Sequence, residues 1–91
     1  MTNKAIITVV GQDTVGIIAK VCTYLAEENI NILDISQTIV QSYFNMMMIV
    51  DASAAAKPFE TIVSELNELG NGIGVQIKCQ REEIFDKMHR I

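Results

Sequence analysis

Residues 5–18 read AIITVVGQDTVGII, and this stretch contains a strand, a turn and the start of a helix in succession. Its first six residues form an almost continuous apolar run rich in β-branched side chains, which is typical of a strand inside a sheet. Gly11 ends the run, and Gly16 ends the polar turn that follows. We therefore predict a central strand that leads through a glycine-bounded turn into a helix.

Apolar residues then recur at spacings of three and four, which predicts an amphipathic helix over about residues 15–28. A second strand begins near Ile30, and its apolar phase shifts after Ile32. Because side chains alternate strictly along a strand, a shift of this kind predicts a bulge or a late entry into the strand.

A hairpin and a second helix follow. Gln41 and Ser42 are two polar residues between β patterns, so the strands on either side are expected to be antiparallel neighbours. Pro58 suits the first turn of a helix, and the apolar face that follows runs until Gly70, where we place the end of the helix. Residues 75–80 alternate between apolar and polar, which predicts the fourth strand.

This order of elements predicts an α+β fold, a ferredoxin-like βαββαβ sandwich. Right-handed crossovers place both helices on one face of a four-stranded antiparallel sheet. We expect one domain over residues 1–91, with a core from 4 to 80 and a short amphipathic C-terminal helix over 81–91.

The third strand, residues 43–51, is apolar on both of its faces. One row of alternate residues is predicted to be core, while Met47 and Ile49 add apolar side chains to the other face; the core row is Phe44, Met46, Met48 and Val50. Both faces of the sheet are therefore expected to be at least partly buried. The second face would be covered by the C-terminal helix, by a second copy of the chain, or by both.

Composition and charge disfavour several classes of protein. The net charge of −4 lacks the basic surface that nucleic-acid binding needs. No run of about 18 apolar residues or signal-type N-terminus occurs, so we expect a cytoplasmic protein without a membrane partner. Cys22 and Cys79 lie far apart in the sequence without a CxxC spacing, and we expect them to be reduced core residues.

Residue patterns for catalysis or metal binding are also missing from the sequence. His89 is the only histidine and has no triad or metal spacing around it. The run of methionines at 46–48 points to alternate faces, so core packing is the better interpretation than a soft-metal site. The pair Glu27 and Glu28 is expected to be solvated charge at a helix end. We therefore predict a protein that is not an enzyme and needs no metal or cofactor.

The turn after the first strand is the best candidate for a binding site. It joins the end of a central strand to a helix N-terminus, where free backbone N–H groups and the positive end of the helix dipole favour an anionic or zwitterionic ligand. The alternative is structural: Asp13 caps the helix, and the two glycines relieve backbone strain.

Four segments in order resemble the ACT domain. They are Asp13-x-x-Gly16, Ile17-Ile18-Ala19-Lys20-Val21, Asn29-Ile30-Asn31-Ile32 and Phe44-Asn45-Met46. The similarity spans nearly the whole chain, and it is closest to the small stand-alone bacterial and archaeal ACT proteins and to the ACT halves of the glycine-cleavage-system transcriptional repressor.

The resemblance implies regulation by a small ligand, usually an amino acid, at the interface of a homodimer. In the serine-sensing ACT domain of phosphoglycerate dehydrogenase, a histidine and an asparagine in the first loop and an asparagine at the start of strand two contact the ligand. Asn31 matches that last asparagine, whereas Gly11 and Asp13 replace the other two, which argues against serine. The residues expected to bind ligand are Gly11, Gln12, Asp13, Thr14, Val15, Gly16, Asn31 and Ile32.

With no output domain in the sequence, such a sensor would act through a separate effector protein. The alternative is a dimeric assembly or adaptor module that binds no ligand.

Overall fold

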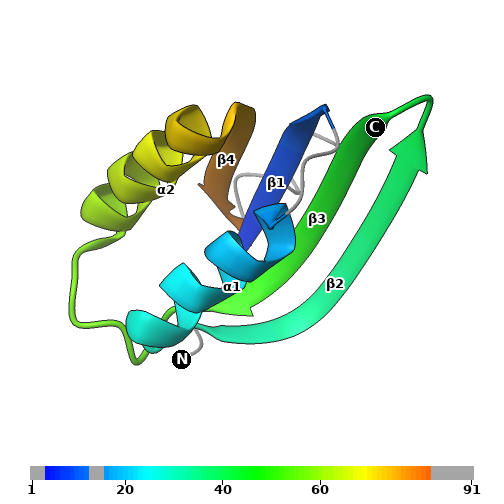
Figure 1. Cartoon of the computed structure of the whole chain (residues 1–91). Helices are drawn as coiled ribbons and strands as arrows, with labels where there is room; N and C mark the ends of the chain where they lie inside the picture. Colours follow the sequence, from blue (N-terminus) through cyan, green and yellow to red (C-terminus); the bar gives the residue numbers. More distant parts are fainter. Residues whose placement is uncertain (1–3, 13–15, 83–91) are drawn as a thin grey trace.

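Two helices pack on one face of a four-stranded sheet in the computed structural model of the chain (Figure 1), which describes residues 4–12 and 16–82. The elements in chain order are β1 (Lys4–Gln12), α1 (Ile17–Glu27), β2 (Asn31–Val40), β3 (Tyr43–Asp51), α2 (Phe59–Ile73) and β4 (Val75–Arg81). The predicted βαββαβ order is therefore confirmed.

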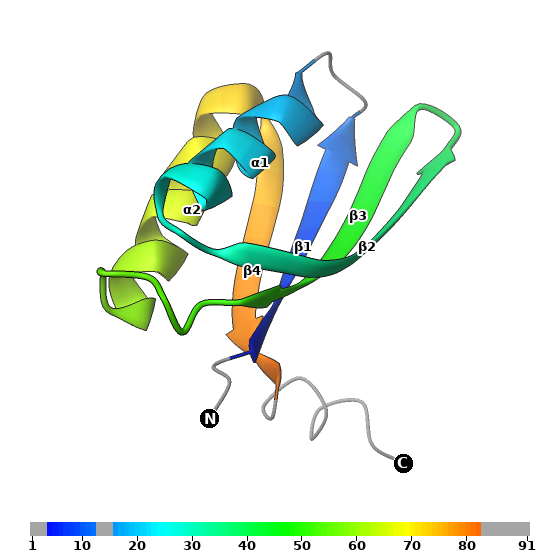
Figure 2. The ribbon, with the colours of Figure 1, turned by 90° about the horizontal axis from the view of Figure 1, so that it is seen from below.

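The sheet has the strand order β2-β3-β1-β4, and each neighbouring pair is antiparallel. Figure 2 shows the helices as one layer and the sheet as the other. β1 lies inside the sheet, as its apolar run predicts, whereas β2 and β4 form the two edges. The two helices stand over the middle of the sheet and over β4, and much of β2 extends beyond α1 (Figure 1).

The hydrophobic core fills the space between the two layers. Alternate residues of β1, β3 and β4 point into it, and α1 contributes Ile17, Val21 and Leu25. The predicted apolar row of β3 is confirmed, since Phe44, Met46, Met48 and Val50 are all buried.

The predicted irregularity in the second strand is a bulge at Leu33. Ile32 lies opposite Val50, and the next registered residue, Asp34, lies opposite Ile49. The extra residue changes the face to which the later side chains point. Ile35 and Ile39 therefore lie on the helix side of the sheet, opposite Met48 and Phe44.

The end of the second helix is predicted wrongly at Gly70, because α2 continues to Ile73. Gly74 ends the helix instead, with φ of 78° and its backbone N–H donating to the carbonyl of Gly70. Gly70 is required for another reason. A Cβ at this position would lie 2.7 Å from the carbonyl oxygen of Val75, so the glycine allows α2 to approach β4 closely.

The second face of the sheet is only partly covered. Ile6 is buried there and Ile49 is half-buried, whereas Val10 and Met47 are 47% and 40% exposed. The predicted C-terminal helix at 81–91 lies outside the described residues except for its start, where Arg81 belongs to β4. Two helices, α1 and α2, are seen in the described part of the chain.

A cation–π contact links β4 to α2. The guanidinium of Arg81 stacks over the ring of Phe59 at 4.4 Å from its centroid, which joins the end of β4 to the start of α2.

In the described ranges, neither helix combines the length and the hydropathy needed to cross a bilayer.

Candidate functional site

The predicted binding turn begins where β1 ends. Gly11 and Gln12 are the last two residues of that strand, opposite Phe44 and Tyr43 of β3. Gly16 is the N-cap residue of α1, with φ of 91°. Asp13, Thr14 and Val15 lie outside the described residues.

Glycine is favoured at each of the two positions of the turn for a different structural reason. A Cβ at Gly11 would lie 2.7 Å from Cγ1 of Val75, because the neighbouring edge strand packs against this position. A Cβ at Gly16 would meet no atom within 4 Å, but the positive φ favours glycine at this position. The sequence alone could not show whether these glycines serve packing and backbone conformation or allow a ligand to approach the backbone.

The N-terminus of α1 is well suited to an anion. Gly16 has no side chain that could accept from the first-turn N–H groups, and the first turn, which is fully described, contains no acidic residue. The first backbone hydrogen bond of the helix runs from the Lys20 N–H to the Gly16 carbonyl, at 3.0 Å. The earlier N–H groups are therefore the donors that a helix N-terminus offers to a carboxylate or phosphate.

Asn31 and Ile32 lie at the other end of the sheet. Asn31 is opposite Asp51 and Asp51 is opposite Lys4, whereas the turn follows Gln12 at the far end of β1. β1 contains 9 residues, so these two ends are separated by roughly 25 Å at about 3.3 Å per residue. Figure 1 shows that β2 starts beside the C-terminal end of α1. One chain therefore does not bring Asn31 to the turn.

The side chains of the two β2 residues also differ in accessibility. Asn31 is exposed, whereas Ile32 is half-buried and packs against the hydrophobic core. Ile32 thus has a structural role in the single chain, and Asn31 remains available to a ligand or to another protein.

A polar cluster that the sequence did not reveal joins the two helices. We call it the Lys57 cluster; it consists of Tyr24, Glu28, Lys57 and Glu65. Nζ of Lys57 lies 3.1 Å from Oε2 of Glu28 and 2.9 Å from Oε1 of Glu65. The Tyr24 hydroxyl donates to that same Oε1 of Glu65 at 2.7 Å. The expectation that Glu28 is merely solvated charge was therefore wrong.

These contacts change the acidities within the Lys57 cluster. Burial and the hydrogen bond to Glu65 raise the pKa of Tyr24 above its usual value. The hydrogen bonds from Tyr24 and Lys57 lower the pKa of Glu65, and the two carboxylates raise the pKa of Lys57. Tyr24, Lys57 and Glu65 therefore keep the ionisation states in which they bind one another near neutral pH.

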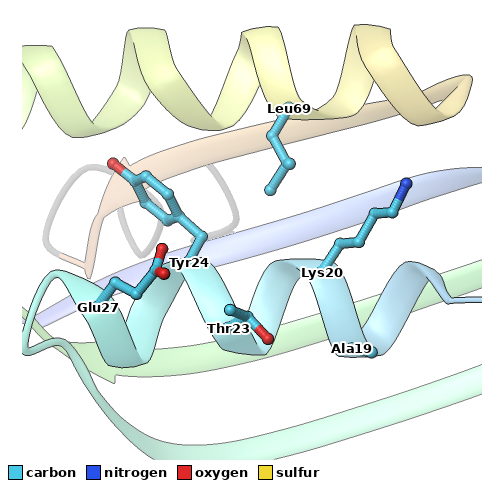
Figure 3. Close-up of a pocket in the computed structure, with 6 residues that line it drawn as sticks. All are labelled: Ala19, Lys20, Thr23, Tyr24, Glu27 and Leu69. Atoms are coloured by element: carbon cyan, nitrogen blue, oxygen red, sulfur yellow. The ribbon is translucent and has the colours of Figure 1, made fainter.

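A groove of about 340 Å³ lies beside this cluster, between α1 and α2 (Figure 3). Leu69 points from α2 toward α1, while Lys20 and Tyr24 point from α1 toward α2. The lining residues are Ala19, Lys20, Thr23, Tyr24, Glu27 and Leu69. This groove contains none of the predicted binding residues and lies on the outer side of the helical layer.

The cysteines remain separate thiols. Cys79 is buried, and burial raises the pKa of its thiol to about 11, whereas Cys22 is half-buried on α1. The predicted core position is therefore confirmed for Cys79 and only partly for Cys22. Within residues 4–12 and 16–82, no group of three or more His, Cys, Asp or Glu side chains is placed to hold a metal ion.

Comparison with known proteins gives consistent matches over almost the full length. Residues 3–80 match the family model of the ACT domain. A UPF0237 protein of Bifidobacterium longum is 71% identical over 89 residues, which cover 98% of this chain and 99% of the relative.

Solved structures agree with the sequence matches. An ACT domain protein from Streptococcus pneumoniae superposes with a TM-score of 0.82 at 41% identity, over 94% of this chain and 97% of that protein. A protein assigned as a glycine cleavage system transcriptional repressor is similar in fold, with a TM-score of 0.76 at 23% identity, and this chain covers 46% of it.

ACT domains are typically regulatory domains that bind small ligands, and they commonly form dimers. The family match over residues 3–80 and the 71% identical relative show that this chain belongs to the ACT domain family, among the small ACT proteins named UPF0237.

Proposed function

We propose that this protein is a non-enzymatic sensor that binds a small zwitterion, most simply an amino acid, at the interface of a homodimer. The observation that carries the proposal is the N-terminus of α1, whose N-cap residue Gly16 makes no side-chain cap hydrogen bond and which lies next to the end of β1. The ligand would act by changing how the dimer contacts a separate effector protein.

The two charges of an amino acid fit different parts of this site. Its carboxylate would accept hydrogen bonds from the first N–H groups of α1, which also lie at the positive end of the helix dipole. Its ammonium group needs an acceptor, and Asp13, which precedes the described start of α1, supplies a carboxylate in the sequence. The side-chain amide of Asn31 would complete the site from a second copy.

A two-fold axis beside β2 would bring Asn31 to the turn. If the β2 strands of two copies pair antiparallel, the first residue of one β2 lies beside the last residues of the other. Those last residues occupy the end of the sheet where the turn follows β1, since Ile39 pairs with Phe44 and Phe44 with Gly11. The site would then be incomplete in one chain and complete in two.

β2 has the properties of a strand that pairs with another copy. It is a 10-residue edge strand without proline or lysine, and its bulge and its one charged residue, Asp34, lie near its start. The backbone edge of residues 35–40 is therefore open to pairing. Three exposed apolar side chains, Ile35 and Ile39 of β2 and Ile18 of α1, are together called the β2 strip; Ile18, Ile35 and Ile39 are 37%, 44% and 58% exposed. Ile35 and Ile39 face the helix side, where a second copy across the β2 edge would cover them.

The ligand site is tested by calorimetric titration of the protein with the amino-acid set. For an amino acid that binds, we expect Asn31→Ala to weaken binding at least about tenfold, because a buried ligand group loses its hydrogen-bond partner. Asp13→Ala should weaken binding similarly. Asn67→Ala, the same change at an exposed position of α2, is the control and should leave the dissociation constant unchanged. Binding that survives both Asn31→Ala and Asp13→Ala would exclude this site.

The dimer is tested separately by analytical ultracentrifugation over a range of concentrations. Ile35→Glu should raise the dimer dissociation constant at least about tenfold, because a charge would be buried against an apolar surface. Val10→Glu is the matched control, since Val10 is 47% exposed and Ile35 44%, but the two lie on opposite faces of the sheet. Dissociation by Val10→Glu alone would place the interface on the other face.

A second function, a ligand-free assembly module, is favoured by the same β2 strip. It needs the dimer but no occupant of the turn. A dimer that Ile35→Glu dissociates, in a protein that gives no heat with any amino acid, would support this function over the sensor.

A further inference from the structure

The two ends of α1 are held in different ways. At the C-terminal end, the Lys57 cluster joins Tyr24 and Glu28 to α2 and to the segment before it. Backbone bonds add to this anchor, because the N–H of Ile30 donates to the carbonyl of Leu25 at 2.9 Å. This end is therefore connected to the sheet, to α2 and to the connection between β3 and α2.

The N-terminal half of α1 has no comparable connection to α2. Among the described side chains, none of residues 17–23 forms a hydrogen bond or an ion pair with α2, although Ala19, Lys20 and Thr23 line the groove between the two helices. Ile17 and Val21 hold this half to the core by apolar packing, while Ile18 and Lys20 are exposed. Apolar packing is non-directional, so it resists a small sliding movement less than a hydrogen-bonded cluster does.

We propose that the Lys57 cluster is a pivot that fixes one end of α1 and lets the end at Gly16 move relative to α2. An 11-residue helix is about 16 Å long, so the half next to Gly16 can shift and open locally while the half beside the cluster stays held. A displacement at Gly16 therefore changes the width of the groove lined by Ala19, Lys20 and Leu69. Helix shifts of about 1–2 Å are a common response to events at a neighbouring site.

The regulatory role of this pivot rests on the proposed function, because it requires a ligand that binds at the turn. A ligand at the turn would contact the mobile end of α1 and would change the outer, helical surface rather than the sheet. An effector that contacts the groove would then distinguish the occupied from the empty state, provided that the ligand binds one position of α1 better than the other.

The test needs no ligand, so its outcome is separate from that of the titration. Amide hydrogen exchange is measured by NMR on the full chain, comparing Val21 and Cys22 in the mobile half with Leu25 and Ala26 beside the cluster. All four amides lie beyond the first turn of the helix. In the natural protein we expect Val21 and Cys22 to exchange at least about tenfold faster than Leu25 and Ala26.

The pivot is removed by the double variant Tyr24→Phe/Lys57→Met, which keeps the ring and the aliphatic stem. Exchange at Leu25 and Ala26 should then rise about tenfold, while the amides of Ile7 and Val9 in β1 stay unchanged. Lys20→Met is the control, because Lys20 lines the same groove and forms no ion pair with any residue in the described ranges. An equal rise in β1 would mean a general loss of stability and would overturn the pivot.

A perturbation at the turn completes the test. Gly16→Ala forces a side chain into a positive φ and should accelerate exchange at Val21 and Cys22 alone when the cluster is intact. Combined with Tyr24→Phe/Lys57→Met, the same change should also accelerate exchange at Leu25 and Ala26. If Gly16→Ala affects both halves of α1 equally in the presence of the cluster, the cluster is not a pivot.

Discussion

Replacing Gly70 by alanine is expected to lower the free energy of unfolding by about 2–3 kcal/mol, because the added methyl group overfills a closely packed contact. The new Cβ would lie 2.7 Å from the carbonyl oxygen of Val75 and 3.0 Å from Cγ1 of Ile77. The first of these atoms belongs to the backbone of β4, so it cannot move aside by a change of rotamer. Urea unfolding followed by circular dichroism measures the loss.

Gly72→Ala is the matched control for this prediction. Gly72 lies in the same helix, and a Cβ there would meet no atom within 4 Å. Alanine at this position should therefore stabilise the protein by up to about 1 kcal/mol, the difference in helix propensity between the two residues. Equal destabilisation by the two changes would show that Gly70 has no special contact with β4.

Gly70 also shows why one residue type can be misread in a sequence. Glycine after an apolar helical face usually marks a C-terminus, and that rule placed the end of the helix at Gly70. The same residue is required wherever two backbones approach closely, and only the position of β4 distinguishes the two cases. A tertiary contact thus decided a boundary that local pattern could not.

Periodicity predicted most of the fold because the core is built on it. The alternation in the third strand identified Phe44 and Met48 as core residues, and the phase shift after Ile32 identified the bulge. Both features are consequences of the two-residue repeat of a strand. The placement of both helices on one face of the sheet followed from the handedness of the two crossovers, which is almost invariant.

The candidate site was predicted less completely, because its parts are far apart in the sequence or in space. The sequence located the turn and Asn31 but not their positions at opposite ends of the sheet, which depend on strand register. The Lys57 cluster joins residues separated by 29 and 41 positions. Polar residues at such separations carry no periodic signal, so Glu28 was interpreted as ordinary solvated charge.

Met46→Ala should lower the free energy of unfolding by about 3 kcal/mol, whereas Met47→Ala should change it by less than about 0.5 kcal/mol. Met46 is fully buried between the sheet and the helices, so its truncation leaves a cavity that the closely packed layers cannot fill. Met47 is 40% exposed on the other face. The two residues are neighbours in β3, so strand propensity and chain position are nearly the same for both changes. The difference between the two losses of unfolding free energy therefore reports only on which face of the sheet each side chain occupies. Urea unfolding of both variants at one protein concentration provides the measurement. Equal losses would mean that the second face is covered as tightly as the core, and the assignment of a single core between the helices and the sheet would then be wrong.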